Sequence, residues 1–202
     1  MIGAVDKRDH CASARCRPRR RETTLIVMHR TINVDADKDG DRDFDDVIRF
    51  FTQDPEGVAT VAIGGKYTSK IETINRWRRL GIPAAYQGAG FVPYHLLIDA
   101  KGGTAQTLEL DAIGAHAGSW ANARGVAVAV VADPRTEAPT TLMLAAAVGV
   151  IAQLLVLYPQ AQVVDHDWIN RRQGYEEKGC IGSLFPLRDV VVAAIAKRDG
   201  QR

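Results

Sequence analysis

Residues 24–29 read Thr-Leu-Ile-Val-Met-His, a short apolar run of β type that ends on a histidine. A second short run of β type, residues 162–165 (Gln-Val-Val-Asp), also stops immediately before a histidine, His166. Residues 126–132 form a third run, and it contains no charged side chain. Short apolar runs of this length are typical of buried strands. We therefore expect strands at all three places, two of them delivering a histidine at their ends.

Helical periodicity separates these strands. The sequence predicts helices over residues 44–51, over residues 69–80, from about Thr140 onward, and over residues 187–197. It also predicts a strand over residues 94–99, followed by a turn at Lys101-Gly102-Gly103. Strands that alternate with helices indicate a single layered α/β domain.

One segment, residues 142–158, is almost wholly apolar and has two interpretations. A membrane span needs about 20 apolar residues, and this stretch is at the lower limit of that length. Pro159 ends it, and candidate ligands lie on both sides of it in the sequence. A span would put those ligands on opposite sides of a membrane, so we expect a buried helix packed on the sheet.

Composition and charge describe an ordinary globular protein. The chain has 202 residues, 46% hydrophobic and 25% charged, with a net charge of +2. This charge is too small to argue for specific nucleic-acid binding. Nothing in the sequence implies an oligomer.

The N-terminal residues 1–22 differ from the rest, because they carry seven basic side chains against three acidic ones. They contain no apolar stretch that could serve as the core of a secretion signal. We expect a basic, flexible arm at 1–22 and the folded domain at 23–202. The arm could contact anionic cell-envelope polymers or lipids, or it could be a solvated tail without a partner.

Three side chains from distant parts of the sequence form a candidate metal site: His29, His166 and Cys180. Imidazole nitrogen and thiolate sulfur are the ligands that zinc prefers in proteins. Three protein ligands leave the fourth tetrahedral position open to water, which distinguishes a catalytic zinc site from a closed structural one. The sequence therefore indicates a zinc hydrolase.

Five short motifs occur in the order and rough spacing of one enzyme family. They are residues 26–31 (IVMHRT), 94–99 (YHLLID), 116–118 (HAG), 166–168 (HDW) and 178–180 (KGC). Over roughly residues 24–190 the chain resembles the type-2 N-acetylmuramoyl-L-alanine amidases, which include phage lysozymes of amidase type and peptidoglycan recognition proteins. It departs from them at Ile181, where the family usually has proline, and in the longer stretch between His166 and Cys180.

The resemblance implies a central mixed β-sheet flanked by helices, with one catalytic zinc held by His29, His166 and Cys180. It also implies that Tyr94 and Lys178 assist catalysis, and that His95 and His116 contact the substrate, bacterial peptidoglycan. Zinc lowers the pKa of bound water to roughly 7, and Lys178 could stabilise the oxyanion that forms when the amide is attacked. An unperturbed phenol has a pKa near 10, so Tyr94 is expected to relay a proton or hydrogen-bond the water rather than act as a simple base.

A second motif, at residues 35–46, fits the template of a calcium-binding loop. Glycine stands at position 6, Asp43 at position 9, and the expected ligands are Asp35, Asp37, Asp39, Asp41 and Asp46. The template has glutamate at position 12, where this chain has the shorter Asp46. The loop could hold calcium or magnesium, or it could be an acidic loop that binds no ion. The sequence predicts a structural calcium site, inserted in the catalytic domain.

Four functions are compatible with these features. We expect an endolysin-like amidase, made in the host cytoplasm without a signal peptide and acting at the cell wall after release. A cytoplasmic amidase that recycles soluble muropeptides would use the same chemistry. A non-catalytic peptidoglycan-binding module would not need all three zinc ligands, and a calcium-regulated interaction domain would leave them without a role.

We predict that calcium stabilises the strand that carries His29, because Asp35 follows this residue by only six positions. Calcium should raise the melting temperature of the wild-type protein and should have little effect on an Asp37→Ala/Asp39→Ala double variant. Thermal unfolding with and without calcium measures both responses. An equal response in the two proteins would contradict the prediction.

Overall fold

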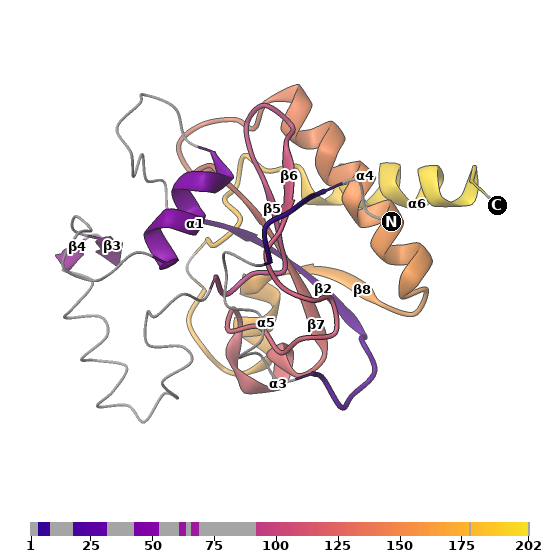
Figure 1. Cartoon of the computed structure of the whole chain (residues 1–202), viewed down its shortest axis with the longest axis horizontal. Coiled ribbons are helices and arrows are strands. Elements are labelled where there is room, and N and C mark those ends of the chain that lie inside the picture. Colours follow the sequence, from indigo (N-terminus) through magenta and orange to yellow (C-terminus); the bar gives the residue numbers. More distant parts are fainter. Residues whose placement is uncertain are drawn as a thin grey trace.

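A six-stranded mixed sheet forms the centre of the fold (Figure 1). The computed structural model describes residues 4–8, 18–31, 43–52, 61–63, 66–68, 92–177 and 179–201. The strands of the sheet, in spatial order, are β1 (Val5–Asp6), β6 (Thr104–Gln106), β5 (Leu96–Ile98), β7 (Gly125–Val130), β2 (Leu25–Arg30) and β8 (Gln162–Asp165). The helices are α1 (Phe44–Thr52), α3 (Gly118–Asn122), α4 (Thr141–Leu157), α5 (His166–Arg172) and α6 (Leu187–Asp199). A separate two-stranded sheet pairs β3 (Val61–Ile63) with β4 (Lys66–Thr68).

The pairing confirms the expected mixed sheet of a layered α/β domain. Strand β2 lies between β7 and β8 and pairs in parallel with both. Strand β5 is also parallel to β7, whereas β6 runs antiparallel to β5. Parallel strands need crossover connections, and helices supply them here: α4 lies between β7 and β8 in the chain. The expected strand over residues 94–99 is shorter in the structure, and the expected helix over residues 69–80 lies outside the described residues.

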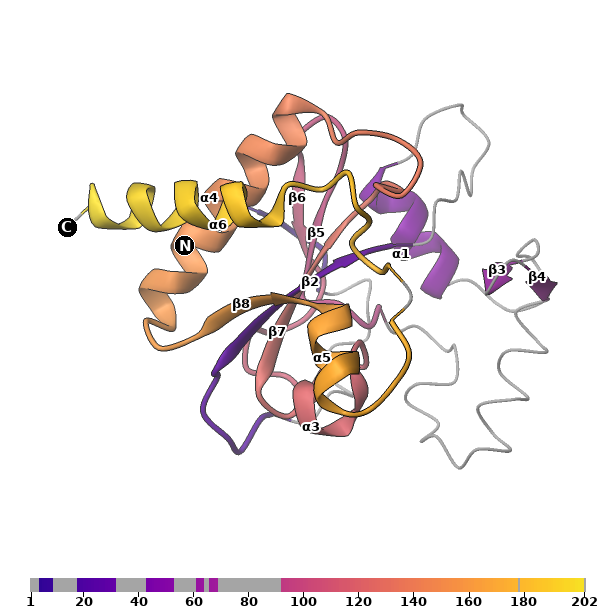
Figure 2. The same cartoon turned by 180° about the vertical axis from the view of Figure 1, so that it is seen from behind.

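Both faces of β2 are buried, which explains its unbroken apolar run. Ile26 and Met28 point to one face and belong to the main hydrophobic cluster, which includes residues of α4 and α6. Leu25 and Val27 point to the other face, where they pack with residues of α3 and α5. Figures 1 and 2 show α4 and α6 together on one side of the sheet. They show α3 and α5 near each other and away from those two helices. Because side chains alternate along a strand, His29 shares the face of Leu25 and Val27.

The apolar segment that could have been read as a membrane span is the buried helix α4, as expected. The Thr140 side chain caps its first turn by accepting a hydrogen bond from the backbone N–H of Met143. Buried residues along the helix, among them Ile151 and Leu154, join the main cluster. Among the helices that the structure describes, none combines the length and apolar character that crossing a membrane requires.

The described parts of the expected N-terminal arm lie against the domain. Strand β1 pairs in parallel with β6, and Lys7 forms an ion pair with Asp45 at 2.9 Å. The guanidinium of Arg19 donates hydrogen bonds to the backbone carbonyls of Leu110 and Gly125. These cations are therefore engaged by the domain itself, whereas Arg20 and Arg21 are exposed.

Asp46, expected as the last calcium ligand, takes part in the cap of α1 in the structure. Its carboxylate accepts a hydrogen bond from the backbone N–H of Asp43 at 3.0 Å, and the Asp43 carboxylate accepts from the backbone N–H groups of Asp45 and Asp46. This reciprocal pair is a capping box, which satisfies N–H groups that a helix start leaves free. The cap accounts for one function of the Asp46 carboxylate, and calcium binding by residues 35–46 stays a prediction. The other four expected ligands, Asp35, Asp37, Asp39 and Asp41, lie outside the described residues.

The turn that carries Cys180 depends on glycine at position 182. Gly182 has φ +80°, and a Cβ there would collide with the backbone of Pro134 and Arg135. Its N–H donates to the carbonyl of Gly179, which closes the turn around Cys180. Gly174 offers a matched comparison, because it has φ +72° and an added Cβ would meet no atom within 4 Å.

We predict that Gly182→Ala destabilises the protein more than Gly174→Ala. Both variants place alanine in the left-handed region, which costs about 1–2 kcal/mol. Only Gly182→Ala adds a collision with backbone atoms, which must move to relieve it. Urea unfolding of the two variants provides the comparison, and equal losses of unfolding free energy would show that the turn adapts to a side chain.

Candidate metal centre

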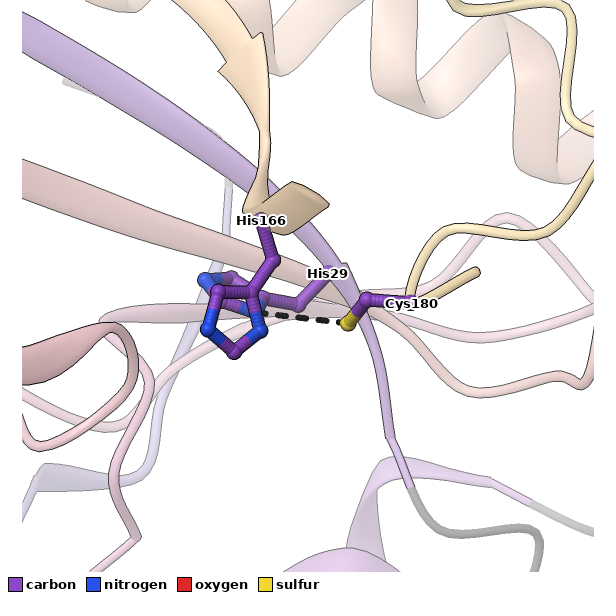
Figure 3. A group of neighbouring side chains, drawn as sticks. All are labelled: His29, His166 and Cys180. Carbon is purple, nitrogen blue, oxygen red and sulfur yellow. Dashed lines mark hydrogen bonds between the residues drawn. The ribbon is translucent and has the colours of Figure 1, made fainter. Parts of the chain in front are cut away.

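The two histidines of the expected zinc site meet because their strands are parallel neighbours. Met28 of β2 is in register with Asp165 of β8, so His29 and His166 follow at the same edge of the sheet. Cys180 reaches them from the turn that follows α5. Figure 3 shows the three side chains pointing toward one another from these three elements.

The geometry suits a zinc ion. One ligand atom from each of the three side chains lies within 4.8 Å of the others. The His29 Nδ1 atom is 3.7 Å from the Cys180 sulfur. Zn–N bonds of about 2.0–2.1 Å and a Zn–S bond of about 2.3 Å at a tetrahedral angle would separate these two atoms by roughly 3.6 Å. Among the described residues this is the one group of three His, Cys, Asp or Glu side chains arranged to hold a metal.

The site is buried on one side and open on the other. His29 is only 1% exposed, whereas His166 and Cys180 are partly exposed. Burial lowers the pKa of His29 well below its usual value, so this imidazole is neutral and has a lone pair for a metal. Burial raises the pKa of the Cys180 thiol, and a hydrogen bond from the Arg30 backbone N–H partly opposes that shift. A metal would have to displace the thiol proton on binding.

His116 lies behind His29 rather than at the open side. Its Nδ1 atom is 3.0 Å from His29 Nε2, the nitrogen that faces away from Cys180. The ring is buried, and burial lowers its pKa well below the usual value. The expected contact with a substrate therefore has no support in this geometry, and the contact that His116 does make is with a candidate metal ligand.

His95 is fully buried, and its ring is held by backbone groups on both sides. Its Nδ1 accepts a hydrogen bond from the N–H of Ala127, and its Nε2 lies 3.0 Å from the carbonyl of Ala112. Burial lowers the pKa of His95 to about 3. Both ring nitrogens are engaged within the protein, so neither is available to a substrate, against the expectation from the sequence.

Tyr94 lies beside the candidate metal ligands, as expected from the sequence. Its ring centroid is 5.4 Å from that of His29, and its backbone carbonyl accepts a hydrogen bond from the Thr107 hydroxyl. Burial, reinforced by the nearby Cys180, raises the pKa of the phenol above its usual value. Tyr94 therefore stays protonated and can donate a hydrogen bond. Lys178, the other expected catalytic residue, lies outside the described residues.

Asp167 joins the turn of Cys180 to helix α5. One carboxylate oxygen accepts a hydrogen bond from the backbone N–H of Cys180 at 2.7 Å, and the other is 3.4 Å from the side-chain amide of Asn170. Asp165, on the other side of His166, caps α5 by accepting from the N–H of Trp168. Asp167 thus links the segments that carry His166 and Cys180. In the sequence, its position next to His166 is only weak evidence for this role.

Two arginines near Cys180 were not singled out from the sequence. Arg135 makes a two-point contact with Asp133, with N–O distances of 2.8 and 2.6 Å. Arg30, the residue after His29, lies 3.6 Å from the same carboxylate. Two cations share one anion here, so these three residues carry a net positive charge, while Asp165 and Asp167 bring negative charge to Cys180. The only signal in the sequence is that an arginine directly follows a candidate ligand.

Solved structures of similar fold come from several kinds of protein. A selenomethionine derivative of AmpD is 19% identical, with a TM-score of 0.62 over 96% of this chain and 95% of that one. The Ph2119 endolysin from the Thermus scotoductus MAT2119 bacteriophage Ph2119 is 16% identical, with a TM-score of 0.57 over 95% and 98%. Drosophila PGRP-LB is 17% identical, with a TM-score of 0.54 over 90% and 89%. At these identities the likeness establishes the fold alone.

The sequence itself matches a family model. No curated protein matches the chain. The model described as N-acetylmuramoyl-L-alanine amidase, however, matches residues 19–182. This range includes all three candidate metal ligands and most of the chain. The protein therefore belongs to the N-acetylmuramoyl-L-alanine amidase family.

Proposed function

We propose that the protein is a zinc-dependent peptidoglycan amidase that hydrolyses the amide bond between N-acetylmuramic acid and the L-alanine of the stem peptide. The observation that carries this proposal is the convergence of His29, His166 and Cys180 in a chain of this family. A family member without catalytic function would have no need to keep three ligands in one place.

The arrangement of the ligands supports a catalytic rather than a structural zinc. A zinc ion held there would lower the pKa of water to roughly 7 and polarise the amide carbonyl. Three protein ligands leave one tetrahedral position free, and the partial exposure of His166 and Cys180 gives it an approach from solvent. His29, which is buried in the sheet, supplies the ligand on the side of the site away from solvent.

Tyr94 is suited to donate a hydrogen bond at this site. Its raised pKa keeps the phenol protonated at neutral pH, so the O–H is available as a donor. From beside His29 it can stabilise charge that develops on the carbonyl oxygen. We keep the expectation that Lys178, two residues before Cys180 in the sequence, supplies a positive charge that stabilises the oxyanion.

We propose intact cell wall as the substrate, with the enzyme made in the host cytoplasm and reaching the wall after release. The partial exposure of His166 and Cys180 would allow a large polymer to reach the site. Exposed Arg20 and Arg21 could add attraction to anionic wall polymers. A soluble muropeptide is the alternative substrate, since the same chemistry would act on it.

Incubation of the protein with intact bacterial sacculi tests the function. We expect mass spectrometry to detect free stem peptides with a new L-alanine amino terminus. A chelator should abolish their release and added zinc should restore it. Cys180→Ser, which removes the thiolate ligand, should release almost none.

The other outcomes separate the alternatives. Release from soluble muropeptides but not from sacculi would replace the lytic role with a recycling one. No release from either substrate would contradict the amidase and favour a peptidoglycan-binding module. Release that persists in Cys180→Ser or under chelation would contradict the zinc site.

We also predict that Asp167→Asn weakens zinc binding. This variant keeps the size of the side chain but loses one of two accepting oxygens, so the Cys180 turn is held less firmly. The zinc dissociation constant should rise by roughly 10–100-fold, as is usual when a group that orients a ligand is lost. Competition with a chromophoric chelator measures it.

Glu177→Gln is the matched control, because it removes the same charge from an exposed side chain in the preceding loop. Its zinc affinity should equal that of the wild type. Equal losses in both variants would assign the effect to net charge rather than to the hydrogen bond.

A further inference from the structure

We propose that His116 is a positioning residue that fixes the tautomer of His29 by accepting a hydrogen bond from its Nε2–H, which leaves the Nδ1 lone pair for the metal. This inference rests on the proposed zinc site and assigns to it a residue from the loop before α3. It concerns the residues of the chain itself and can be tested through metal affinity, apart from catalysis.

The contact between the two rings requires one proton. His29 Nε2 and His116 Nδ1 are 3.0 Å apart, a normal hydrogen-bond distance. Both imidazoles are buried, with exposed fractions of 1% for His29 and 8% for His116. A hydrogen bond between two ring nitrogens needs an N–H on one and a lone pair on the other, so one ring donates and the other accepts.

The direction of the hydrogen bond follows from where His29 points. Its Nδ1 atom faces the Cys180 sulfur at 3.7 Å, on the side where a metal would sit. A metal needs the lone pair of that nitrogen, so the proton of His29 must be on Nε2. His116 must then accept at Nδ1 and carry its own proton on Nε2. The opposite arrangement would put a proton on His29 Nδ1, directed at the sulfur, and would block the ligand.

A comparison with His95 shows that His116 is not held as an ordinary core histidine. Both ring nitrogens of His95 are satisfied by backbone groups. In His116 the Nε2 atom is buried and, within the described part of the chain, has no hydrogen-bond partner. Its one ring hydrogen bond is to a candidate metal ligand. An imidazole kept for packing alone would gain more from satisfied nitrogens.

The surrounding backbone is shaped to hold this ring. A Cβ at Gly114 would lie 2.9 Å from His116 Cδ2, so the close approach requires glycine. The Asn122 side chain of α3 accepts hydrogen bonds from the backbone N–H groups of His116 and Ala117, at 3.1 and 2.9 Å. These contacts fix the loop from which His116 reaches His29.

Zinc-affinity measurements on three variants test the inference. His116→Leu removes the acceptor and should raise the zinc dissociation constant by roughly 10–100-fold. His116→Asn keeps an acceptor oxygen near the position of Nδ1 and should recover most of that loss. His95→Gln is the matched control, because it alters an equally buried histidine that bonds to backbone rather than to a metal ligand, and it should bind zinc like the wild type.

Urea unfolding without metal shows which variants fold. If a variant does not fold, NMR of the imidazole groups of the wild-type protein tests the inference instead. In the zinc-loaded wild type, long-range ¹H–¹⁵N spectra should show a proton on His29 Nε2 and none on His116 Nδ1. A proton on His116 Nδ1 would overturn the inference. So would wild-type affinity in His116→Leu, or equal losses in His116→Leu and His95→Gln.

The result separates this inference from the proposed function. A wild-type protein that does not bind zinc would overturn the zinc site and this inference with it. A wild-type protein that binds zinc and releases stem peptides, with His116→Leu unaffected in zinc affinity, would overturn the inference alone.

Discussion

The parallel pairing of β2 with β8 is the constraint on which the rest of the site depends. Its register sets Met28 beside Asp165, and the histidine that follows each of them therefore appears at one edge of the sheet. A slip of one residue would turn His29 to the opposite face, among the side chains of α4 and α6. Such a slip would also turn Leu25 and Val27 away from the side chains with which they pack. Because apolar side chains fill both faces of β2, burial of the core selects the register that assembles the ligands.

The third ligand depends on different physics. Cys180 lies in a turn, where no sheet register specifies its place. Its position comes from the hydrogen bond of its N–H to buried Asp167 and from the close approach of Gly182 to the Pro134 backbone. Polar contacts and a turn are less rigid than a packed strand. The site thus combines one ligand fixed deep in the core, His29, with two that are partly exposed, His166 and Cys180.

The sequence predicts those features that depend on local pattern. The short runs of β type predict β2, β7 and β8, and the histidines at the ends of two of these runs indicate where the metal site lies. The roles of His95 and His116 could not be assigned in this way, because they depend on which backbone groups and rings the fold brings to each nitrogen. Asp46 shows the same limit: the alternating aspartates suggest an ion ligand, and only the hydrogen bonds of α1 reveal that its carboxylate also caps a helix. Spacing identifies residue types suited to a task, and tertiary contacts decide which of them perform it.

The two histidines behind the site, His95 and His116, show that the same type of residue can serve the fold or the site. A buried polar group without a partner costs about 1–3 kcal/mol. His116 Nε2 has no hydrogen-bond partner among the described residues, so it lowers the stability of the fold. His95, whose two ring nitrogens are both satisfied, has no such cost and ties β7 to the loop at Ala112. Among the described residues, the ring of His116 makes its one hydrogen bond with His29, through Nδ1. A metal bound to His29 would offset the cost at Nε2, because a ligand that binds only the folded state adds to the stability of that state.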